Sequence, residues 1–518
     1  MKTYDAIVVG AGLAGLTSAA YLSRAGLNTL LIEKRPKTGG LVETFWYKDY
    51  AFDAGIRAFE NSGIVFPMLK DLGIELDIIR NQVSIGVADQ SVQLTSEESL
   101  EDYTFMLMEL FPDNISDIFH IKLEIRKVME YMSVLYGIDN PLFLSDMDLT
   151  YLRKTLLPWF IKYQVNIRKA GRLNEPIEQY MTRFTSNQSL IDMIIQHFFK
   201  QTPTFFALSY FSLYLDYCYP IGGTGVLAKK MTEYIASNGG EVMTGVGVVR
   251  LDGDQHQVEL TDGQVVEYKQ LIWSADQRTL YQVTEGINTP DFEKQRRLSQ
   301  DSRGGDSILT FFVGVDRPKE YFEDKCGAHM FYTPQTIGLS SLPDWRGLDT
   351  SSELYDWAND YLERTTYEIS CPVLRDQQLA PEGKTGLIIS TLMDYDLVQR
   401  MSQLGEYEQF KQSCTQKMID VFEKSLFPGI TESLEFSLCA TPMTIERETH
   451  NTDGAITGWS FTNPEMPSEN RFKKISRAID TPIPDVYQAG QWTFSPSGLP
   501  VSIVTGKLAA NQLVKAKK

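Results

Sequence analysis

The spacing of apolar and polar residues changes several times along the chain, and each change predicts a different kind of element. Residues 5–9 and 29–32 are short, continuous apolar runs, which are typical of buried parallel strands. The segment between them has helical periodicity through Tyr21 and Leu22. The chain therefore begins with a predicted strand, helix and strand.

From about residue 98 to residue 214, helical periodicity replaces the strand pattern. In the predicted helix 189–199, one face carries Leu190, Ile191, Ile194, Ile195 and Phe198. We expect His197 in this helix to be a packed or surface residue rather than a catalytic one. Aromatic residues are dense throughout the segment, so we expect a helical cap that lines an apolar cavity.

Strand patterns return after a glycine-rich turn at 219–225. The sequence then predicts a helix at 226–237, a strand at 241–251, a hairpin of 257–260 with 265–268, and a buried strand at 270–276. Gly245 and Gly247 lie inside the predicted strand and open no helix, so we do not expect a second nucleotide site there.

Residues from about 307 to 477 alternate strands with helices and predict a second unit that contains a sheet. Its clearest predicted elements are strands at 308–315 and 387–392 and a helix at 406–426. A strand at 484–492 and a helix at 501–514 follow. The small residues Gly506, Ala509 and Ala510 would let that last helix pack closely.

Gly10, Gly12 and Gly15 stand between the first predicted strand and helix in the spacing G-x-G-x-x-G. In dinucleotide-binding proteins these glycines permit a tight turn, close approach of the backbone to a pyrophosphate, and close packing of helix on strand. The helix N-terminus favours the phosphates. Glu33, which ends the second strand, can accept hydrogen bonds from a ribose diol. The motif predicts a dinucleotide site but does not decide between NAD and FAD.

Two further motifs follow this unit: the glycine pair Gly39-Gly40 and the sequence Phe-Asp-Ala-Gly at 52–55. They agree with a turn into an extra hairpin or with backbone that passes close to a long cofactor. We favour the second interpretation because both motifs stand next to the phosphate loop. Near the other end of the chain, Pro500 suits the first turn of a helix whose N-terminus would stabilise a reduced flavin.

Composition argues against several classes of binding site and location. The formal net charge of −18 over 518 residues argues against nucleic-acid binding, which needs a basic surface. The five cysteines and five histidines are scattered, so we predict free thiols in a reducing cytosol and no metal site. Asp5 and the glycine loop interrupt the first apolar run, so we expect a cytoplasmic protein without a signal peptide.

The segment 153–172 departs from this acidic average, because it holds six cations and no acidic residue. Apolar residues such as Leu157, Phe160 and Val165 lie between the cations. The segment is either a solvated basic face on a buried helix or a peripheral contact with the inner face of a membrane, where each cation would contribute about 1 kcal/mol on anionic lipid.

Together these motifs resemble the FAD-dependent family of phytoene desaturases, carotenoid isomerases and retinol saturases. The matching pieces are spread over nearly the whole chain and include 8–16, Gly39-Gly40, 52–55, 219–225, 489–492 and 498–500. The segments 379–384, 441–442 and 454–459 are similar to the saturase and isomerase branch. Leu41 and Gln491 depart from the family pattern, which commonly has a basic residue and an aspartate at these positions.

The resemblance implies FAD as cofactor and assigns residues to it. The pyrophosphate would contact Gly10, Gly12, Leu13, Ala14 and Gly15. The adenosine would contact Glu33, Lys34 and, through backbone, Val248. Gly39, Gly40 and Leu41 would pass near the ribityl chain, Gly490 and Gln491 near the second phosphate, and Leu499, Pro500 and Val501 near the pyrimidine edge of the flavin.

The resemblance also implies the architecture, an α/β fold in which a Rossmann-like FAD-binding domain is interleaved with a substrate domain of mixed sheet plus helical cap. We expect FAD-binding parts at 1–97, 215–306 and 480–518, the cap at 98–214 and the substrate domain at 307–479.

The leading functional hypothesis is desaturation, saturation or isomerisation of C=C bonds in a long apolar polyene or isoprenoid, by hydride transfer with flavin N5. A quinone or oxygen would be the electron acceptor. A flavin amine oxidase or protoporphyrinogen-oxidase-like enzyme, and a non-enzymatic lipid or pigment binder with structural FAD, are the alternatives. Arg57 and Glu60 are candidate polar groups near the flavin, and a surface ion pair is the alternative for them.

Overall fold

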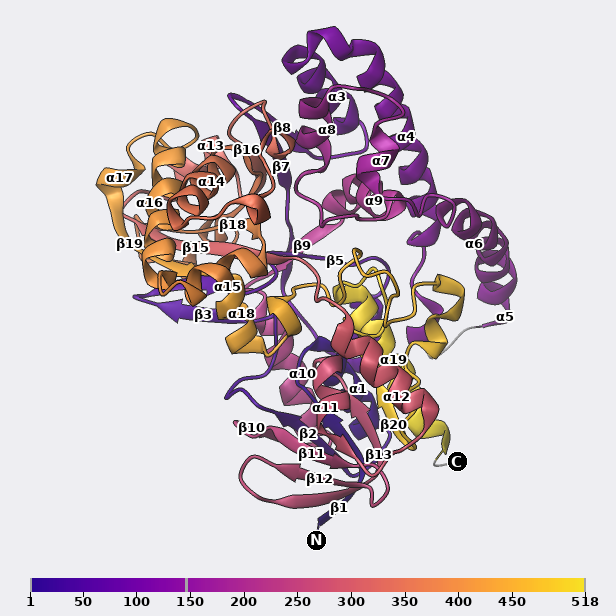
Figure 1. The fold of residues 1–518 in the computed structure, drawn as a ribbon. Coiled ribbons are helices and arrows are strands. Elements are labelled where there is room, and N and C mark those ends of the chain that lie inside the picture. The colour runs from indigo at the N-terminus through magenta and orange to yellow at the C-terminus, as the bar shows by residue number, and fades with distance from the viewer. Residues whose placement is uncertain (1, 145–147, 517–518) are drawn as a thin grey trace.

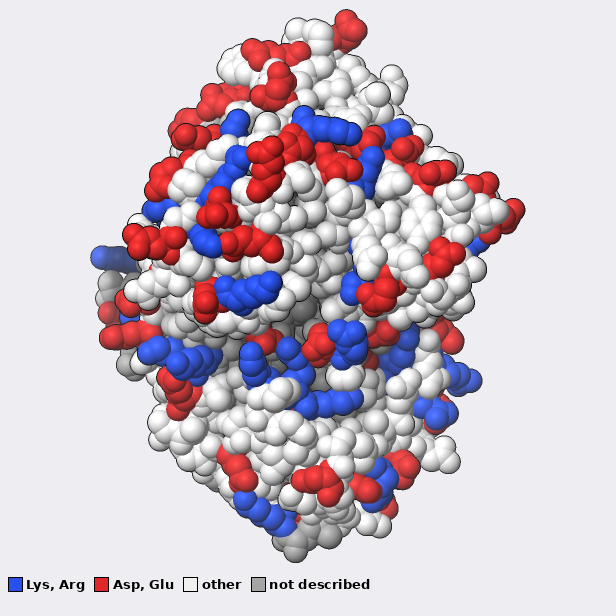
Figure 2. All heavy atoms as spheres, turned by 90° about the vertical axis from the view of Figure 1, so that its left-hand side faces the viewer, with Lys and Arg blue, Asp and Glu red and all other residues white. Residues whose placement is uncertain are grey.

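Three regions make up the molecule in the computed structural model, which describes residues 2–144 and 148–516 (Figure 1). A sheet with flanking helices at the bottom of Figure 1 holds both ends of the chain. A second sheet with its own helices lies at the upper left, and a helical cap lies at the upper right. Acidic and basic side chains are interspersed on the face in Figure 2, and the surface is hollowed near its middle.

The first sheet has five parallel strands at its centre, as the short apolar runs predict. Their order is β10 (Glu241–Thr244), β2 (Thr29–Glu33), β1 (Lys2–Val9), β13 (Val265–Trp273) and β20 (Val486–Gln488). β13 continues into an antiparallel meander with β12 (Gln257–Leu260) and β11 (Val248–Asp252), and β14 (Thr284–Glu285) pairs with β11 at the edge. In the centre, Val8 lies opposite both Leu31 and Ile272.

Helices α1 (Leu13–Arg24), α10 (Gly225–Ser237) and α19 (Leu499–Ala516) share one core with this sheet. α1 and α19 pack with their backbones in contact, because a Cβ on Gly506 would lie 2.4 Å from the carbonyl oxygen of Ala14. Ala509 and Ala510 are fully buried. The small residues of the last helix therefore have the packing role that the sequence predicts.

The second sheet has seven strands, in the order β19 (Leu434–Ala440), β15 (Ser307–Val315), β18 (Thr385–Met393), β17 (Tyr367–Ser370), β16 (His329–Thr333), β7 (Val83–Val87) and β8 (Gln90–Leu94). Helices α14 (Ser351–Arg364) and α16 (Tyr407–Lys424) pack on it. β7 and β8 lie within the range 1–97, which the sequence assigns to FAD binding, but β7 pairs with β16 in parallel. The predicted domain boundaries themselves stay a prediction.

The cap contains α3 (Ser99–Leu110), α4 (Ile115–Leu135), α7 (Ile177–Met181), α8 (Gln188–Ile195) and α9 (Thr204–Leu215). The predicted helix 189–199 is wrong at its end, because α8 stops at Ile195. The Gln196 side chain donates to the Arg364 carbonyl and to Thr366, and it accepts from the Leu339 N–H. These bonds to the second unit stop the helix and turn the next residues toward the interior.

Three strand predictions need correction. The predicted strand 241–251 is broken into β10 and β11, because Gly245 turns the chain at φ +75°. The predicted strands 265–268 and 270–276 form one strand, β13, and the predicted strand 484–492 is only the three residues of β20. Gly245 and Gly247 thus lie between strands rather than inside one, although no helix begins there.

The segment 153–172 lies at the outer edge of the cap, where α6 (Leu157–Ala170) projects at the right of Figure 1. Of its residues only Ile167 and Ala170 are buried. Leu157, Phe160, Ile161 and Val165 are exposed beside the cations. The interpretation as a solvated basic face on a buried helix is therefore right about the exposed cations and wrong about the helix, which is not buried. No helix among the described residues is long and apolar enough to cross a membrane.

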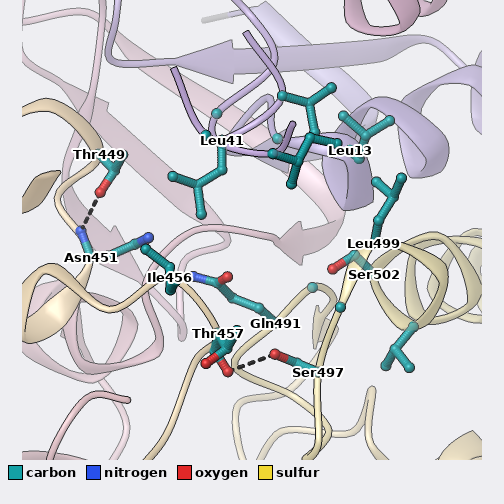
Figure 3. Close-up of a pocket in the computed structure, with 18 of the residues that line it drawn as sticks. Leu13, Leu41, Thr449, Asn451, Ile456, Thr457, Gln491, Ser497, Leu499 and Ser502 are labelled. Carbon is teal, nitrogen blue, oxygen red and sulfur yellow. Dashed lines mark hydrogen bonds between the residues drawn. The ribbon is translucent and has the colours of Figure 1, made fainter. Parts of the chain in front are cut away.

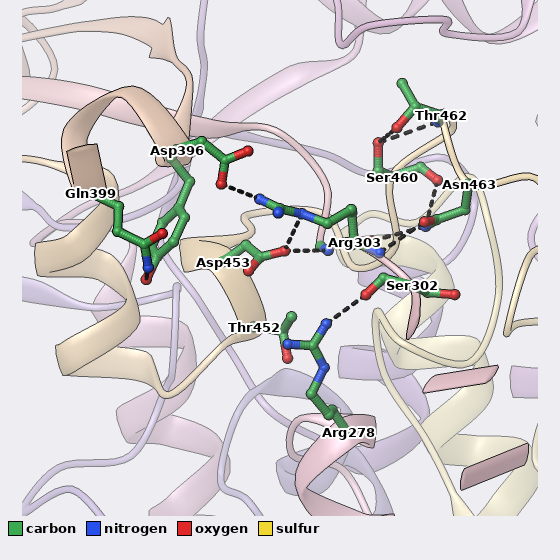
Figure 4. A network of polar contacts seen from close by, with 12 residues as sticks. Arg278, Ser302, Arg303, Asp396, Gln399, Thr452, Asp453, Ser460, Thr462 and Asn463 are labelled. Atoms are coloured by element: carbon green, nitrogen blue, oxygen red, sulfur yellow. Dashed lines mark hydrogen bonds and ion pairs between the residues drawn. The ribbon is translucent and has the colours of Figure 1, made fainter. Parts of the chain in front are cut away.

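A polar network fastens the chain where it leaves the first unit for the second, between α12 (Pro290–Asp301) and β15 (Figure 4). The Arg303 guanidinium pairs with Asp396 at 2.5 Å and with Asp453 at 3.0 Å. The backbone N–H of Arg303 donates to Asn463 Oδ1 at 2.8 Å. The crossover is thus held by residues of the second unit on both sides.

Candidate functional site

One cavity of about 580 Å³ lies where the first sheet, the second sheet and the cap meet. Its lining includes Gly10, Gly12, Leu13, Ala14, Glu33, Lys34, Gly39, Gly40, Leu41, Val248, Gly490, Gln491, Leu499, Pro500 and Val501. Arg57 and Glu60 also line it. Figure 3 shows Leu13, Leu41, Gln491 and Leu499 pointing into the same space from different parts of the chain. Gly15, the remaining predicted residue, is not part of the lining.

The glycine loop has the geometry that its spacing predicts. Gly10 has a φ of +95°, and a Cβ there would meet backbone of Ser274 and Ala275 at 3.0 Å. A Cβ on Gly12 would meet no atom within 4 Å and would project into the cavity. A Cβ on Gly15 would lie 1.8 Å from the Gly10 carbonyl oxygen. Gly15 therefore packs helix on strand, while Gly12 keeps the cavity open.

Two helices begin at this cavity. Gly12 caps α1 without a side chain, and the first turn of α1 carries no acidic residue, so its backbone N–H groups remain available to an anion. α19 begins at Leu499, and Leu499, Pro500 and Val501 all line the cavity. The two positive helix ends favour negative charge at both places.

Glu33 ends β2 at the edge of the cavity, as the sequence predicts. Its Oε2 accepts a hydrogen bond from the Ala11 N–H at 2.7 Å, and its Oε1 accepts from the Arg35 N–H at 2.9 Å. These bonds fix the carboxylate beside the glycine loop. Lys34 and Val248 line the same end of the cavity.

The interpretation of the motifs at 39–40 and 52–55 as a turn into an extra hairpin is confirmed, and their passage close to a cofactor stays a prediction. β3 (Thr44–Tyr47) and β4 (Tyr50–Asp53) form the extra hairpin. The glycines also bring backbone to the cavity wall: a Cβ on Gly55 would lie 2.0 Å from the Leu41 carbonyl oxygen, and a Cβ on Gly40 would lie 3.3 Å from the Gly12 Cα. Leu41 and Gly55 both line the cavity.

Asp53 in the second of these motifs is fully buried and organises the turn. Its carboxylate accepts hydrogen bonds from the Thr44 hydroxyl, from the Tyr219 hydroxyl, and from both the N–H and the hydroxyl of Thr224, at 2.7 to 2.9 Å. The motif at 52–55 and the turn at 219–225 are therefore one structural unit, although more than 150 residues separate Asp53 from Tyr219.

Arg57 is 2% exposed, so a surface ion pair with Glu60 is wrong. The guanidinium donates to the Asp53 carbonyl at 2.7 Å, to the Gly55 carbonyl, and to the Ser390 hydroxyl at 2.8 Å. Ser390 belongs to β18. Arg57 thus connects the loop beside the cofactor cavity to the second sheet.

Glu60 ends the short strand β5 (Phe59–Glu60), and its carboxyl oxygen lies 4.0 Å from the place where a Cβ on Gly498 would sit. It therefore stands at the α19 end of the cavity. Burial raises the pKa of the Glu60 carboxyl to about 7, and the charge of Asp216 adds to the shift. At neutral pH this carboxyl can both give and take a proton.

The loop after Asp453 contributes a wall that the sequence indicates only through family resemblance. Ile456 and Thr457 line the cavity, and the Ser497 hydroxyl donates to the Thr457 carbonyl at 2.6 Å (Figure 3). A Cβ on Gly458 would lie 2.3 Å from the Gln491 carbonyl oxygen. This close contact positions Gln491 at the cavity.

The cap side of the cavity is aromatic. Its lining residues of this kind are Tyr136, Phe198, Phe199, Phe205, Phe206, Tyr210, Tyr214, Tyr217 and, from β16, Phe331. His329 and Glu368 were not predicted and stand in the same wall. The His329 ring is hydrogen-bonded through Nε2 to Glu368 at 2.9 Å and through Nδ1 to the Asn81 amide at 3.0 Å. The side chain of Glu368 is 32% exposed, toward the cavity, whereas that of His329 is 0% exposed.

The family model of the flavin containing amine oxidoreductases matches residues 13–514. The chain belongs to this family. Its cofactor is accordingly the flavin dinucleotide FAD. The cavity fits that group, because Gly12 leaves space at an uncapped helix N-terminus and the lining extends from Glu33 at one end of the first sheet to the N-terminus of α19.

Curated relatives of low identity cover most of the chain. The chloroplastic prolycopene isomerase of Arabidopsis thaliana is 24% identical over 463 residues, which are 86% of this chain and 72% of that protein. The lycopene-forming phytoene desaturase of Pseudescherichia vulneris is 22% identical, over 98% of this chain and 99% of that protein. The all-trans-retinol 13,14-reductase of Danio rerio is 22% identical, with 94% and 82% covered.

The fold is also that of solved oxidoreductases. An oxidoreductase from Methanosarcina mazei superposes with a TM-score of 0.64 at 14% identity, over 99% of this chain and 100% of that one. The predicted fold class, an α/β FAD-binding fold with mixed sheets and helices, is confirmed.

Residues of the second unit are what sequence reasoning missed. Glu368 is a lone acid in the apolar run of β17, and its place opposite Phe331 depends on the pairing of β16 with β17. Nothing in the sequence fixes that pairing.

Proposed function

We propose that the protein is an FAD-dependent oxidoreductase that desaturates, saturates or isomerises C=C bonds of a long apolar polyene of the carotenoid or retinoid type. One observation carries this proposal: a single cavity joins the dinucleotide loop to an aromatic wall. A ligand held by that wall would lie beside the flavin. The three relatives are named for reactions of prolycopene, phytoene and retinol, which supports the same class of ligand.

We propose the following contacts with FAD. Gly10, Gly12, Leu13 and Ala14 would hold the pyrophosphate at the N-terminus of α1, and Gly15 would support the loop by packing. Glu33 and Lys34 would hold the ribose, with Val248 at the adenine. Gly39, Gly40 and Leu41 would follow the ribityl chain, Gly490 and Gln491 the second phosphate, and Leu499, Pro500 and Val501 the pyrimidine edge.

When bound, FAD supplies the hydride acceptor or donor, and the chain supplies orientation, exclusion of water and one proton carrier. In a desaturation, one carbon loses a hydride and its neighbour loses a proton. Glu60 is the group that would accept this proton, because its carboxyl lies in the cavity and has a pKa of about 7. In a saturation the same carboxyl would return the proton. Arg57 would hold the loop in position.

The proposal is tested by anaerobic incubation of the oxidised and the reduced holoprotein with a panel of carotenoids and retinoids. Products are separated by HPLC, and the visible flavin band is followed at the same time. We expect the number or the geometry of the double bonds to change in at least one polyene of the panel. Bleaching by an amine, with no change in any polyene, would favour an amine oxidase instead. No product in either redox state would contradict an enzymatic role on polyenes.

The lining of the cavity bears on the amine alternative. A flavin amine oxidase would be supported by a lysine that holds a water beside the flavin. Among the described lining residues the lysine is Lys34, which stands next to Glu33 at the proposed adenosine end.

We also propose a quinone or oxygen as the electron acceptor. Reoxidation of the reduced protein by a quinone and by oxygen, measured separately, distinguishes the two acceptors.

We further propose that α6 and the residues before it attach the protein to a membrane surface. The cations Arg153, Lys154, Lys162, Arg168, Lys169 and Arg172 are exposed, and within the described residues none of them joins an ion pair. Exposed Leu149, Leu157, Phe160, Ile161 and Val165 accompany them. A helix of this kind lies in the headgroup region, with its apolar residues in the interface and its cations on anionic lipid.

A further inference from the structure

Two polar atoms in the aromatic wall have no hydrogen-bond partner in the part of the chain that the structure describes. They are the hydroxyl of Tyr214 and Nε2 of His197. Both residues line the cavity, and Tyr214 is only 3% exposed. Buried polar groups in native proteins are normally paired, and an unpaired one in a binding cavity is a candidate for contact with a ligand.

The two side chains come from separate elements and converge on one ring. The Tyr214 ring, on α9, lies 4.9 Å from the Phe331 ring, and the His197 ring, just after α8, lies 5.5 Å from it. Phe331 stands directly opposite Glu368 in the pairing of β16 with β17. Two unpaired polar atoms and one carboxylate therefore share the same part of the wall.

The charges in this part of the wall are already balanced. His329 is hydrogen-bonded to Glu368, and the charges of Arg57 and Arg375 act on the same carboxylate. Burial opposes ionisation of Glu368, but these three groups hold its pKa below the ordinary value. The guanidinium groups of Arg57 and Arg375 stand beside two carboxylates, those of Glu368 and Asp53. Among the described residues of this wall no cation is therefore left over for an anionic ligand, and a charged group would be buried without a partner.

His197 and Tyr214 are themselves uncharged. Burial lowers the pKa of His197 to about 4, and burial raises the pKa of Tyr214 well above its usual range. A neutral imidazole and a phenol each donate or accept a hydrogen bond. Their complement is an uncharged oxygen, as in an alcohol or a carbonyl.

We infer that Tyr214 and His197 form a subsite for a hydroxyl or carbonyl oxygen at one end of an otherwise apolar ligand. The substrate is then a polyene with an oxygenated end rather than a pure hydrocarbon. This inference rests on the proposed function and narrows its substrate class. The aromatic rings around the subsite bind the apolar chain, and the two polar atoms select its orientation.

The test is an equilibrium titration of the oxidised holoprotein, without oxygen, in which binding is read from the perturbation of the flavin absorption band. The probes share one polyene skeleton: retinol, retinal, retinoate and the hydrocarbon analogue axerophthene, which lacks the oxygen. We expect retinol or retinal to bind about tenfold more tightly than the hydrocarbon, which corresponds to about 1.4 kcal/mol. Retinoate should bind no better than the hydrocarbon.

Two variants locate the effect. Tyr214→Phe and His197→Phe keep a ring in place and remove the polar atom, so each should weaken retinol or retinal by about tenfold. Binding of the hydrocarbon should stay unchanged. Tyr103→Phe is the matched control, because Tyr103 is a buried phenol of the same cap, stands next to Phe211 and does not line the cavity.

A failure of the subsite and a failure of the proposed function give different results in this titration. Equal binding of hydrocarbon and alcohol to the wild type, or equal losses for both in Tyr214→Phe, would overturn the subsite and leave the proposed function standing. If no polyene perturbs the flavin band, the proposed function is contradicted and the subsite with it.

Discussion

Glu60 is the residue whose ionisation the fold places at neutral pH. Its carboxyl is buried at the end of β5, opposite Tyr217 on β9 (Tyr217–Pro220), and next to Gly498. Burial holds its pKa at about 7. An acid or base with this pKa works best near pH 7, so Glu60 combines a suitable position with a suitable proton affinity.

Glu60→Gln should remove a pH dependence as well as activity. We expect the wild-type rate on a polyene to change through an inflection near pH 7, and the variant to lose that inflection. The loss of a proton carrier should lower kcat about 100-fold. The measurement is a pH–rate profile, with Glu382→Gln on an exposed turn as control. An unchanged profile in Glu60→Gln would exclude this role.

The raised pKa of Glu60 also makes the stability of the fold depend on pH. The pKa of Glu60 is raised in the folded state, so between about pH 4.5 and 7 the folded protein binds more protons than the unfolded chain, and its stability falls as pH rises. Glutamine stays neutral throughout. In the apoprotein we expect Glu60→Gln to increase the free energy of unfolding by about 1–3 kcal/mol more at pH 8 than at pH 5. The measurement is a denaturant titration at each pH. If the pKa of Glu60 were not raised, Glu60→Gln would change the free energy of unfolding by the same amount at both pH values.

Gly12 offers a second test at the scale of one residue. A Cβ there would clash with no protein atom but would occupy the space proposed for the pyrophosphate. Gly12→Ala should therefore leave the apoprotein folded and reduce the FAD that copurifies with it by at least about tenfold. Gly347→Ala is the control, because Gly347 also has open space and lies on a surface turn. Full FAD occupancy in Gly12→Ala would contradict the proposed contact.

At the scale of elements, α6 has an outward surface that is both apolar and basic, and its sequence contains no acidic residue. Ile161 is 60% exposed and Phe160 is 49% exposed, yet neighbouring positions carry Lys162 and Arg168. A soluble surface does not need large apolar side chains in this arrangement, whereas a lipid interface uses both kinds.

Ile161→Ser should weaken the binding of the protein to vesicles that contain anionic lipid. Loss of one apolar side chain from the lipid interface should decrease the partition coefficient about tenfold. Added salt should weaken the binding that remains, because that part depends on the cations. The measurement is cosedimentation with anionic and with zwitterionic vesicles. Ile337→Ser is matched, because Ile337 is 51% exposed and lies outside α6. Equal binding of both variants and the wild type would argue against this surface.

Elements were predictable from sequence where an apolar run or a glycine motif decided them locally. The strand 241–251 was not, since its apolar pattern is continuous and only the φ of Gly245 breaks it. The helix 189–199 was not, since the bonds that end it run from Gln196 to residues of the second unit. At the site, the loop residues from Gly10 to Glu33 came from local spacing, whereas Glu368 required knowledge of strand pairing.

At the scale of the molecule, the cavity depends on segments from the beginning, middle and end of the chain. Gly12, Val248 and Pro500 line it together, and Arg57 ties its wall to the second sheet. A ligand held by all of these segments stabilises the folded state of the whole chain.

FAD should accordingly raise the thermal midpoint of the apoprotein. At about a thousand times the dissociation constant, the expected stabilisation is about 4 kcal/mol. Flavin release and the change in tryptophan fluorescence should then coincide in one transition, and Gly12→Ala should show no comparable shift. Separate transitions for flavin release and tryptophan fluorescence would show that the second sheet unfolds independently.

The arrangement of the first sheet has a consequence for biosynthesis. β20 completes the parallel sheet beside β13, and α19 packs against α1, so a segment made earlier and one made nearly 500 residues later meet directly. A chain still attached to the ribosome before α19 emerges has an exposed apolar surface on α1 and an open cofactor site. We expect the cofactor to be held by the complete set of cavity residues only after translation has passed this region, and the exposed apolar surface to need protection from aggregation until then.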